Sequence, residues 1–257
     1  MSKFYQEHLE SKNQAVELSL IIPCLNEEDN IGIVLEDIDC IVKKFNLNNI
    51  ETVILDDSST DHTFDRAVDC CDQYPELNIR IIRRYEPRRG YGAVVRFGIA
   101  SAKGLYCIPI SADAVDPLEI LPTFLDKMRN GADMVQCSRY LEDNDASTIP
   151  FKYKFFQNIW RFLVRFLLGQ EIRDSTYSYK IFRRVDVLGL GIVSNGFSIS
   201  PEIFFKLLLS GAKIEYIPHG QGVRKIGTSK FLFLREGTGY SYVLLRAWLH
   251  RFGILWF

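Results

Sequence analysis

The sequence predicts an α/β fold in which helices cover both faces of a mostly parallel central sheet. Short apolar runs without alternating polar residues recur up to Cys137, as expected of strands that are buried on both faces. Stretches with helical spacing of apolar residues separate these runs, and strands that alternate with helices form parallel sheets. The length of 257 residues and the hydrophobic content of 47% are sufficient for one large core.

The first predicted strand begins at Leu18, and its apolar run breaks at Pro23. A polar loop follows, and then a helix whose apolar residues recur at helical spacing over 31–41. The pattern repeats, with strands predicted at 52–55, 79–82, 105–110 and 134–137, and with helices that begin near Thr63, Gly92 and Pro117. Ligands bind beyond the carboxyl ends of the strands in such sheets, so we expect the polar loops at these ends to converge on one edge.

The pattern changes after Pro150. A helix is predicted over 151–169, with basic and amide side chains on one stripe and mainly aromatic residues opposite. The predicted elements that follow are a strand at 178–184, a helix at 200–211 closed by Gly211, a strand at 213–218, a polar loop at 224–230 and an aromatic tail. The helix and the tail either lie in a membrane interface or pack on the core.

Charge is distributed unevenly along the chain. From Pro150 onward there are 16 Lys and Arg against 6 Asp and Glu, whereas the preceding residues contain 15 against 26. Carboxylates in the acidic half could hold a metal, and the basic half could meet an anionic substrate or a membrane surface. The alternative is a chance segregation of solvated faces.

The six cysteines form no CxxC pair and fall mostly in apolar runs, so we expect reduced, structural thiols in a cytoplasmic protein. The amino-terminal stretch MSKFYQEHLESKNQ is polar and lacks the apolar segment of a secretory signal. No uninterrupted run reaches the roughly 18 apolar residues of a membrane-spanning helix. We expect no nucleic-acid partner.

Adjacent carboxylates follow the second predicted strand. Asp56 and Asp57 come directly after its apolar run, and Asp61 stands a few residues further on. Because like charges side by side repel, we expect a cationic group or a ligand rich in hydroxyls to lie against the pair. Asp61 precedes a predicted helix, so it either caps this helix or contacts a ligand.

Seven motifs in order resemble those of family 2 glycosyltransferases, in particular the branch of dolichol- or polyprenyl-phosphate sugar synthases. They are LSLIIPCLNEEDNI, VILDDSSTDHT, RGYGAVVRFGIASAKG, ISADAVDP, CSRY, DSTYSYKIFRR and RKIGTSKF. The resemblance implies a nucleotide-diphospho-sugar transferase fold of the GT-A type over 1–231, followed by an amphipathic tail at 232–257. Within it, 1–149 would form the nucleotide-sugar-binding half and 150–231 the acceptor-binding half.

The resemblance assigns the donor to the first half. Nucleotide-sugar contacts are implied for Pro23, Asn26, Glu27, Asp56, Asp57, Arg89, Gly92, Ala112 and Asp113. Carboxylates suit this role because they accept hydrogen bonds from ribose hydroxyls and base N–H groups. Arg88, Arg89, Gly90 and Gly92 precede a predicted helix, whose free backbone N–H groups would let an anion approach unless the glycines form a plain tight turn.

The segment SADAVDP departs from the family pattern. Relatives carry Asp-x-Asp there, and Ser111 stands where the first Asp is expected. The resemblance implies that Asp113, with Asp116 as the substitute, holds Mg²⁺ or Mn²⁺, because these ions use one or two carboxylates when phosphates and waters complete the shell. The alternative is a degenerate site in a protein that binds nucleotide-sugars without transferring them.

The basic half is implied to recognise the acceptor. The resemblance assigns the acceptor phosphate to Ser138, Arg139, Arg224, Ser229 and Lys230. Arginine presents a planar fork that phosphate oxygens match. Together with Asp113, the two arginines are the implied catalytic residues.

Two further features bear on the acceptor. Asp174 and Lys180 belong to DSTYSYKIFRR, in which Ser178 replaces the usual Gly. Glu202 could serve as a base, since transfer to a sugar hydroxyl requires removal of a proton, or it could orient other groups. A phosphate acceptor is already ionised near neutral pH and needs only placement.

The resemblance therefore implies an inverting glycosyltransferase that moves a hexose from a GDP- or UDP-sugar to undecaprenyl or dolichyl phosphate. The alternative enzyme transfers the hexose to a sugar hydroxyl in surface polysaccharide synthesis. We expect a cytoplasmic protein that is peripherally associated with the inner face of the membrane. A second copy of the chain or a membrane protein would be a further partner.

Overall fold

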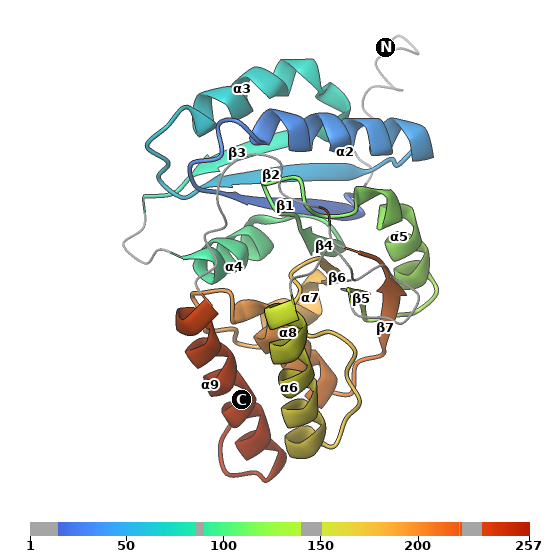
Figure 1. Cartoon of the computed structure of the whole chain (residues 1–257). Coiled ribbons are helices and arrows are strands. Elements are labelled where there is room, and N and C mark those ends of the chain that lie inside the picture. The colour runs from blue at the N-terminus through green and yellow to red at the C-terminus, as the bar shows by residue number, and fades with distance from the viewer. Residues whose placement is uncertain (1–14, 86–89, 140–150, 221, 223–232) are drawn as a thin grey trace.

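The structure, a computed structural model, describes residues 15–85, 90–139, 151–220, 222 and 233–257. Its strands form one seven-stranded sheet (Figure 1). They are β1 (Leu18–Cys24), β2 (Ile50–Asp56), β3 (Ile79–Arg83), β4 (Tyr106–Pro109), β5 (Met134–Ser138), β6 (Lys180–Arg183) and β7 (Ile214–Pro218). Their order in the sheet is β3-β2-β1-β4-β6-β5-β7.

The sheet is mostly parallel, as predicted. Strand β6 pairs antiparallel with both β4 and β5, whereas the other pairs are parallel. Strand β6 therefore begins at the carboxyl edge of β4 and β5 and runs back. Strands β1, β2, β4 and β5 therefore end at the same edge, which confirms the predicted convergence of their loops.

Helices cover both faces of the sheet, as predicted, with a separate apolar core on each side. One face is covered by α2 (Ile31–Phe45), α3 (Thr63–Gln73) and α5 (Leu121–Arg129), and the other by α4 (Tyr91–Ser101), α7 (Arg184–Gly189) and α8 (Ile199–Leu209). Short 3-10 turns, η1 (Pro75–Leu77) and η2 (Leu118–Ile120), precede β3 and α5. Figure 1 shows α2 and α3 on one side of β1 and β2 and α4 on the other.

The buried strands supply both cores because successive side chains point to opposite faces. Leu20 and Ile22 of β1 belong to the core under α2, whereas Ile21 belongs to the core under α4. Gly98 lets α4 approach this second face closely, since a Cβ atom there would lie 2.5 Å from the Ile21 side chain and 2.6 Å from that of Leu55. All six cysteines are free thiols.

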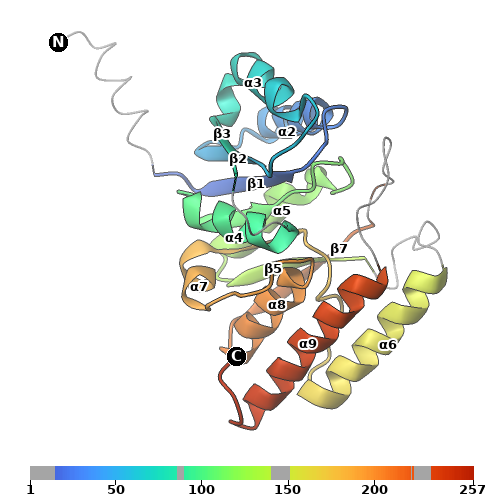
Figure 2. The same ribbon diagram turned by 90° about the vertical axis from the view of Figure 1, so that its left-hand side faces the viewer.

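Helices α6 (Phe151–Leu168) and α9 (Phe233–Arg251) lie side by side beyond the second face (Figure 2). Each buries one stripe: α6 through Val164 and Leu168, and α9 through residues that include Val243 and Ala247. Each also exposes apolar side chains, namely Phe155, Phe156, Ile159, Phe162, Leu163, Phe166, Tyr242 and Leu245, with Phe252, Ile254 and Trp256 exposed after α9. Core packing and an exposed apolar face therefore occur on the same helices. Within the described residues, none of the helices is long and apolar enough to cross a membrane.

Candidate active site

The loops after β1 and β2 interlock at the carboxyl edge of the sheet. Asn26, which has a left-handed backbone with φ 51°, accepts a hydrogen bond from the Thr60 backbone N–H at 2.8 Å. Its own N–H donates to the Ser59 hydroxyl at 3.0 Å. Glu28 accepts from the His62 N–H at 2.9 Å. These contacts bring together the two loops that are predicted to bind the nucleotide-sugar, and they fix the loop backbones.

Arginines of the same chain lie against the paired aspartates. Strand register places Asp56 opposite Arg83, whose Nε lies 3.0 Å from Oδ2 of Asp56. The next residue, Arg84, places a guanidinium nitrogen 2.7 Å from Oδ1 of Asp57, and this pair is almost completely buried. The cationic groups expected against the carboxylates are therefore supplied by the last residue of β3 and the residue that follows it. Sequence reasoning missed these arginines, although two adjacent Arg residues at the end of a neighbouring strand were a visible signal.

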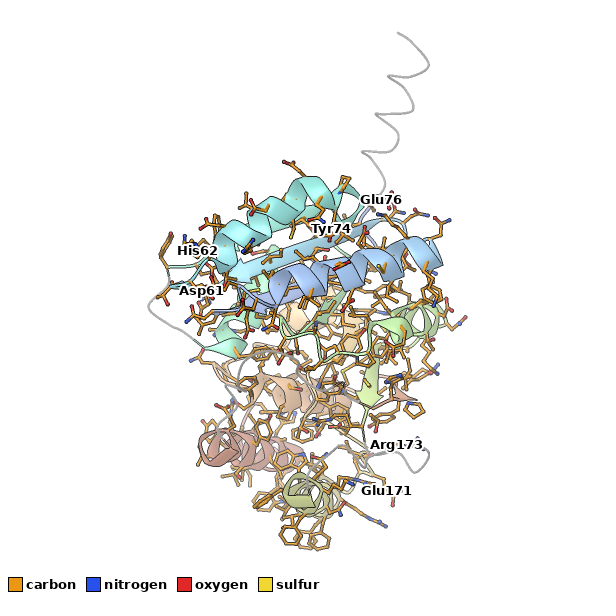
Figure 3. The ribbon with its side chains drawn as sticks, turned by 45° about the horizontal axis from the view of Figure 1, so that its top comes forward. Asp61, His62, Tyr74, Glu76, Glu171 and Arg173 are labelled. Atoms are coloured by element: carbon orange, nitrogen blue, oxygen red, sulfur yellow. The ribbon has the colours of Figure 1, made fainter. Side chains whose placement is uncertain are left out.

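Asp61 accepts a hydrogen bond from the first N–H group of α3, whose N-cap residue is His62. Its Oδ1 accepts hydrogen bonds from the backbone N–H and the hydroxyl of Thr63, and its Oδ2 accepts from the Glu28 N–H at 3.2 Å. Burial opposes ionisation, but these hydrogen bonds outweigh it and lower the pKa of Asp61. Figure 3 shows Asp61 and His62 at one end of α3 and Tyr74 and Glu76 at the other. Of the two roles expected for Asp61, the structure shows the capping role.

The segment after β4 carries two carboxylates, Asp113, which is half-buried, and Asp116. Asp116 is buried, and its two oxygens accept hydrogen bonds from the Ser111 N–H and the Tyr177 hydroxyl, each at 2.6 Å. Burial raises the pKa of Asp116 to about 6, and the charge of nearby Asp113 acts in the same direction. Ser111 thus contributes its backbone to the ordering of this loop. The described residues contain no group of three or more His, Cys, Asp or Glu that could hold a metal by themselves.

The amino-terminal end of α4 is filled by another part of the chain. The N–H groups of Gly92 and Ala93 donate to the carbonyl of Asn195, at 2.8 and 3.3 Å. A Cβ atom on Gly92 would lie 2.5 Å from the Ser194 carbonyl oxygen, so only glycine permits this approach. The Gly92 N–H group is therefore already bound within the chain and does not face an anion in this structure. This glycine is required because the segment before α8 packs on it.

Arg139 is held rigidly just beyond the end of β5. Its Nε lies 2.9 Å and one terminal nitrogen 3.3 Å from the two carboxylate oxygens of Asp174, and the same nitrogen donates to the Thr176 hydroxyl at 3.0 Å. The guanidinium also lies over the Tyr177 ring, 4.6 Å from its centroid. Burial opposes ionisation of Asp174, but Arg139 outweighs it and lowers the pKa of this carboxyl. The adjacent Ser138 hydroxyl is buried and has no hydrogen-bond partner among the described residues.

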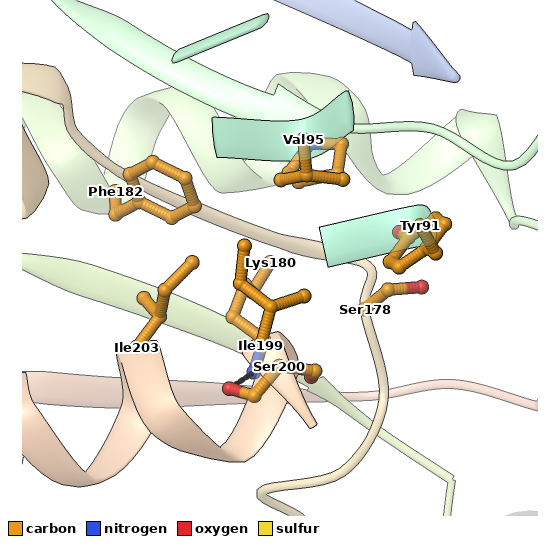
Figure 4. A pocket seen from close by; sticks show the side chains of 9 residues that line it. Tyr91, Val95, Ser178, Lys180, Phe182, Ile199, Ser200 and Ile203 are labelled. Atoms are coloured by element: carbon orange, nitrogen blue, oxygen red, sulfur yellow. Dashed lines mark hydrogen bonds between the residues drawn. The ribbon is translucent and has the colours of Figure 1, made fainter. Parts of the chain in front are cut away.

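Lys180 is a buried lysine close to the Arg139 cluster. Its Nζ donates to the carbonyls of Ser175, at 3.3 Å, and Ser200, at 3.0 Å. Burial lowers the pKa of Lys180 to about 7, although the charge of Asp174 opposes this shift. Figure 4 shows the lysine directed at Ser200 in a cavity of about 10 Å³, enough for one water, that Ser178 also lines.

Glu202 lies inside the protein with no exposed surface. Its carboxylate accepts hydrogen bonds from the N–H groups of Val193, at 3.1 Å, and Ser194, at 2.8 Å. Lys206, one turn along α8, places its Nζ 3.1 Å from the same carboxylate. Both carboxylate oxygens of Glu202 therefore accept hydrogen bonds from the segment that covers the amino-terminal end of α4.

The remaining predicted site residues divide into two groups. Pro23 lies within β1, opposite Leu55; Glu27 is buried and accepts a hydrogen bond from Asn30; and Ala112 is buried after β4. Five basic or polar residues lie outside the described residues: Arg88, Arg89, Arg224, Ser229 and Lys230. The described part of the site thus consists of the interlocked donor loops, the carboxylates after β4 and the Arg139 cluster.

Comparisons with known proteins find similar sequences. The chain is 30% identical over 230 residues to a dolichol-phosphate mannosyltransferase of Pyrococcus furiosus, with 89% of this chain and 62% of that protein covered. It is 27% identical over 202 residues to a dolichyl-phosphate hexose transferase of Haloferax volcanii, covering 79% and 81%. The chain thus spans less than two thirds of the Pyrococcus protein.

Solved structures share the fold. Glucosyl-3-phosphoglycerate synthase from Mycobacterium tuberculosis, in complex with Mn²⁺, uridine diphosphate and glucosyl-3-phosphoglycerate, superposes with a TM-score of 0.68 at 19% identity, covering 96% of this chain and 83% of that chain. The model of glycosyl transferase family 2 matches residues 19–188. This match includes the interlocked loops, the carboxylates after β4 and the Arg139–Asp174 pair, and the chain therefore belongs to glycosyl transferase family 2.

Proposed function

We propose that the chain is an inverting glycosyltransferase that moves a hexose from a GDP- or UDP-sugar to a polyprenyl phosphate at a membrane surface. The observation that carries this proposal is the Arg139 guanidinium, which Asp174 and Thr176 hold rigidly at the carboxyl edge of the sheet. A guanidinium that the protein already orients needs little reorganisation to bind a phosphate oxygen. The similar proteins of Pyrococcus furiosus and Haloferax volcanii are a dolichol-phosphate mannosyltransferase and a dolichyl-phosphate hexose transferase, and they support this assignment.

The donor would bind in the half formed by 1–149. The interlocked loops after β1 and β2 offer Asn26, Glu27 and the aspartate pair to the nucleoside, while Asp113 lies after β4, the neighbour of β1 in the sheet. Arg83 and Arg84 form ion pairs with the two aspartates, whose remaining lone pairs can accept hydrogen bonds from the nucleoside.

A divalent cation fits this site with few protein ligands. Asp113 would hold it, with the donor diphosphate and waters in the remaining positions, as Mg²⁺ and Mn²⁺ allow. When bound, the ion would neutralise charge on the departing nucleoside diphosphate. Asp116 would order the loop through Ser111 and Tyr177, because both its oxygens already accept hydrogen bonds.

The acceptor phosphate would lie between Arg139 and the Ser138 hydroxyl, in the half formed by 150–231 and the end of β5, with Arg224, Ser229 and Lys230 as further proposed contacts. A phosphate oxygen would attack the anomeric carbon as the bond to the diphosphate breaks, which inverts the centre. No protein base is needed for an ionised phosphate. The engagement of Glu202 with Val193, Ser194 and Lys206 supports a positioning role for this carboxylate over proton abstraction.

The exposed apolar face of α6 and α9 would place the site at the membrane. Phe162 and Phe166 are 65% and 74% exposed, and Arg161 and Arg165 flank them on α6. Aromatic side chains flanked by arginines are typical of helices that lie in a lipid interface. We therefore propose peripheral association with the cytoplasmic face of a membrane, where a polyprenyl phosphate presents its head group.

The test is incubation of the purified chain with radiolabelled UDP-glucose, UDP-galactose or GDP-mannose, with and without undecaprenyl phosphate and Mn²⁺. We expect label in the organic phase only when lipid phosphate and Mn²⁺ are both present. Label in a water-soluble oligosaccharide acceptor instead would favour transfer to a hydroxyl. Binding of the nucleotide-sugars without transfer to either acceptor would identify a non-catalytic binding protein.

A further inference from the structure

The segment Val193–Phe197, between α7 and α8, is held from three helices. Glu202 of α8 accepts its first two N–H groups. Arg96 of α4 donates to the Ser194 carbonyl and, at 2.8 Å, to the Asn195 side chain. Glu236, in the first turn of α9, accepts the Phe197 N–H at 3.0 Å. This short segment thus links α4, on the side proposed for the nucleotide-sugar, to α9, on the side proposed for the acceptor.

The same segment sets the position of α4. The Asn195 carbonyl accepts the N–H groups of Gly92 and Ala93 in the first turn of α4. The Phe197 ring stacks on the Tyr91 ring, with 4.7 Å between the ring centroids and an interplanar angle of 12°. Burial raises the pKa of Tyr91, and the charges of Asp116 and Asp113 add to this shift. Tyr91 also lines the small cavity beside Ser178, and the adjacent Tyr177 donates its hydroxyl to Asp116, so the start of α4 lies close to the carboxylates after β4.

Helix α9 borders the acceptor side. Tyr240 lies one turn after Glu236 and contacts the Trp160 ring of α6 at 5.7 Å. Burial raises the pKa of Tyr240, and the charge of Arg139 opposes this shift. Trp160 also donates to the Ser175 hydroxyl at 3.0 Å, and the adjacent Asp174 pairs with Arg139, so the first turns of α9 lie close to the Arg139 cluster.

We propose that Glu236 is a positioning residue that fixes α4, beside the donor carboxylates, relative to α9, beside Arg139. This inference rests on the proposed function for its kinetic consequence alone. Direct displacement requires the attacking phosphate and the anomeric carbon to be aligned, and small displacements of either side lower the rate steeply. Glu236 would control this alignment without touching either substrate.

Gly196 offers an independent way to disturb the same contact. A Cβ atom there would lie 2.9 Å from Oε2 of Glu236, and the backbone of Gly196 is not in the left-handed region. Alanine at this position would therefore act mainly by displacing the Glu236 carboxylate. Gly196→Ala and Glu236→Ala should then disrupt the same interaction, the hydrogen bond between Glu236 and the Phe197 N–H.

The experiment compares Glu236→Ala, Glu236→Gln, Gly196→Ala and the double Ala variant of the full chain. Hydrogen–deuterium exchange is measured by mass spectrometry over the first turns of α4 and over 193–198. We expect Glu236→Ala and Gly196→Ala to speed exchange about tenfold in both regions, and the double variant to match either single one. Glu236→Gln retains an oxygen that accepts the Phe197 N–H and should exchange like the unaltered chain.

Activity provides the second measurement, with undecaprenyl phosphate and the donor that the unaltered chain uses. Glu236→Ala should lower kcat about tenfold, while the KM for the donor changes less than about twofold and Glu236→Gln restores kcat. Unchanged exchange over α4 in Glu236→Ala, or additive effects in the double variant, would overturn the proposal. If the unaltered chain transfers no sugar, the proposed function fails, and the exchange data still decide the role of Glu236.

Discussion

Arg84, directly after β3, forms a buried ion pair with Asp57, directly after β2, with 2.7 Å between the guanidinium nitrogen and the carboxylate oxygen. Parallel register causes this pairing, because it places the end of β3 beside the end of β2. The side chains of both residues are no more than 6% exposed. Their charges are therefore taken out of water and depend on each other.

Replacement of Arg84 by Met is expected to lower the free energy of unfolding by about 3 kcal/mol or more, because it leaves the Asp57 charge buried without its partner. Urea denaturation monitored by circular dichroism measures the change. The double variant Arg84→Met/Asp57→Asn should recover part of the loss. A loss below about 1 kcal/mol in Arg84→Met would show that Asp57 is stabilised by other groups.

Replacement of Asp174 by Asn should weaken acceptor binding more than donor binding. The amide lacks the charge that holds Arg139 at 2.9 Å, so the guanidinium loses its fixed direction. We expect the KM for lipid phosphate to rise roughly tenfold, with a change below about twofold for the nucleotide-sugar. Asp133→Asn is the matched control, because Asp133 pairs with Arg183 at 3.4 Å in a more exposed position. Equal weakening of both substrates in Asp174→Asn would indicate a general structural role.

Replacement of Asp113 by Ala is expected to lower transfer by about 100-fold or more and to weaken Mn²⁺-dependent binding of the nucleoside diphosphate, since it removes the proposed ligand of the ion. Asp116→Ala should be less severe. Isothermal titration with the nucleoside diphosphate and Mn²⁺ measures the binding, and thermal unfolding checks that the fold is intact. Normal turnover of Asp113→Ala in metal-depleted buffer would exclude this assignment.

Lys180 should give the protein a characteristic pH dependence. Its pKa is about 7 in the fold against an ordinary value of 10.5, so between these values the unfolded chain binds the additional proton. Stability from this residue therefore rises with pH across this window, by at most about 1.4 kcal/mol per pH unit. Denaturation at pH 7.5 and 9 should show the rise in the unaltered chain and a smaller one in Lys180→Met. Identical pH dependence in both proteins would show that Lys180 does not titrate in this range.

Replacement of Phe162 and Phe166 by Glu should reduce sedimentation with anionic liposomes severalfold without lowering the melting temperature, because both side chains are exposed. A deletion that begins at Ala247 is less informative, since Ala247 itself is fully buried. Nucleotide-sugar binding by the double variant should be unchanged. If this variant binds vesicles as well as the unaltered chain does, the aromatic face of α6 is not the anchor.

The order of apolar runs and polar loops was sufficient to predict the parallel sheet and the edge at which the loops meet. This succeeds because burial on both faces requires continuous apolar strands, and parallel strands place their ends together. The sequence also marked Asp113, Arg139 and Asp174 by motif, and the capping of α3 by Asp61 was one of the two roles expected for it. These features depend either on residues that are close along the chain or on a pattern of strands that allows only one arrangement of the sheet.

Pairings between distant segments were decided by the tertiary structure alone. The reversal of β6, the contact of Asp57 with Arg84 and the filling of the α4 terminus by Asn195 each depend on how separate elements meet. Glycines before a helix predict close approach, but they do not say whether a ligand or a backbone carbonyl approaches. Likewise, the buried carboxylate of Glu202 could be assigned to Val193 and Ser194 only once α8 and the segment before it were placed in space.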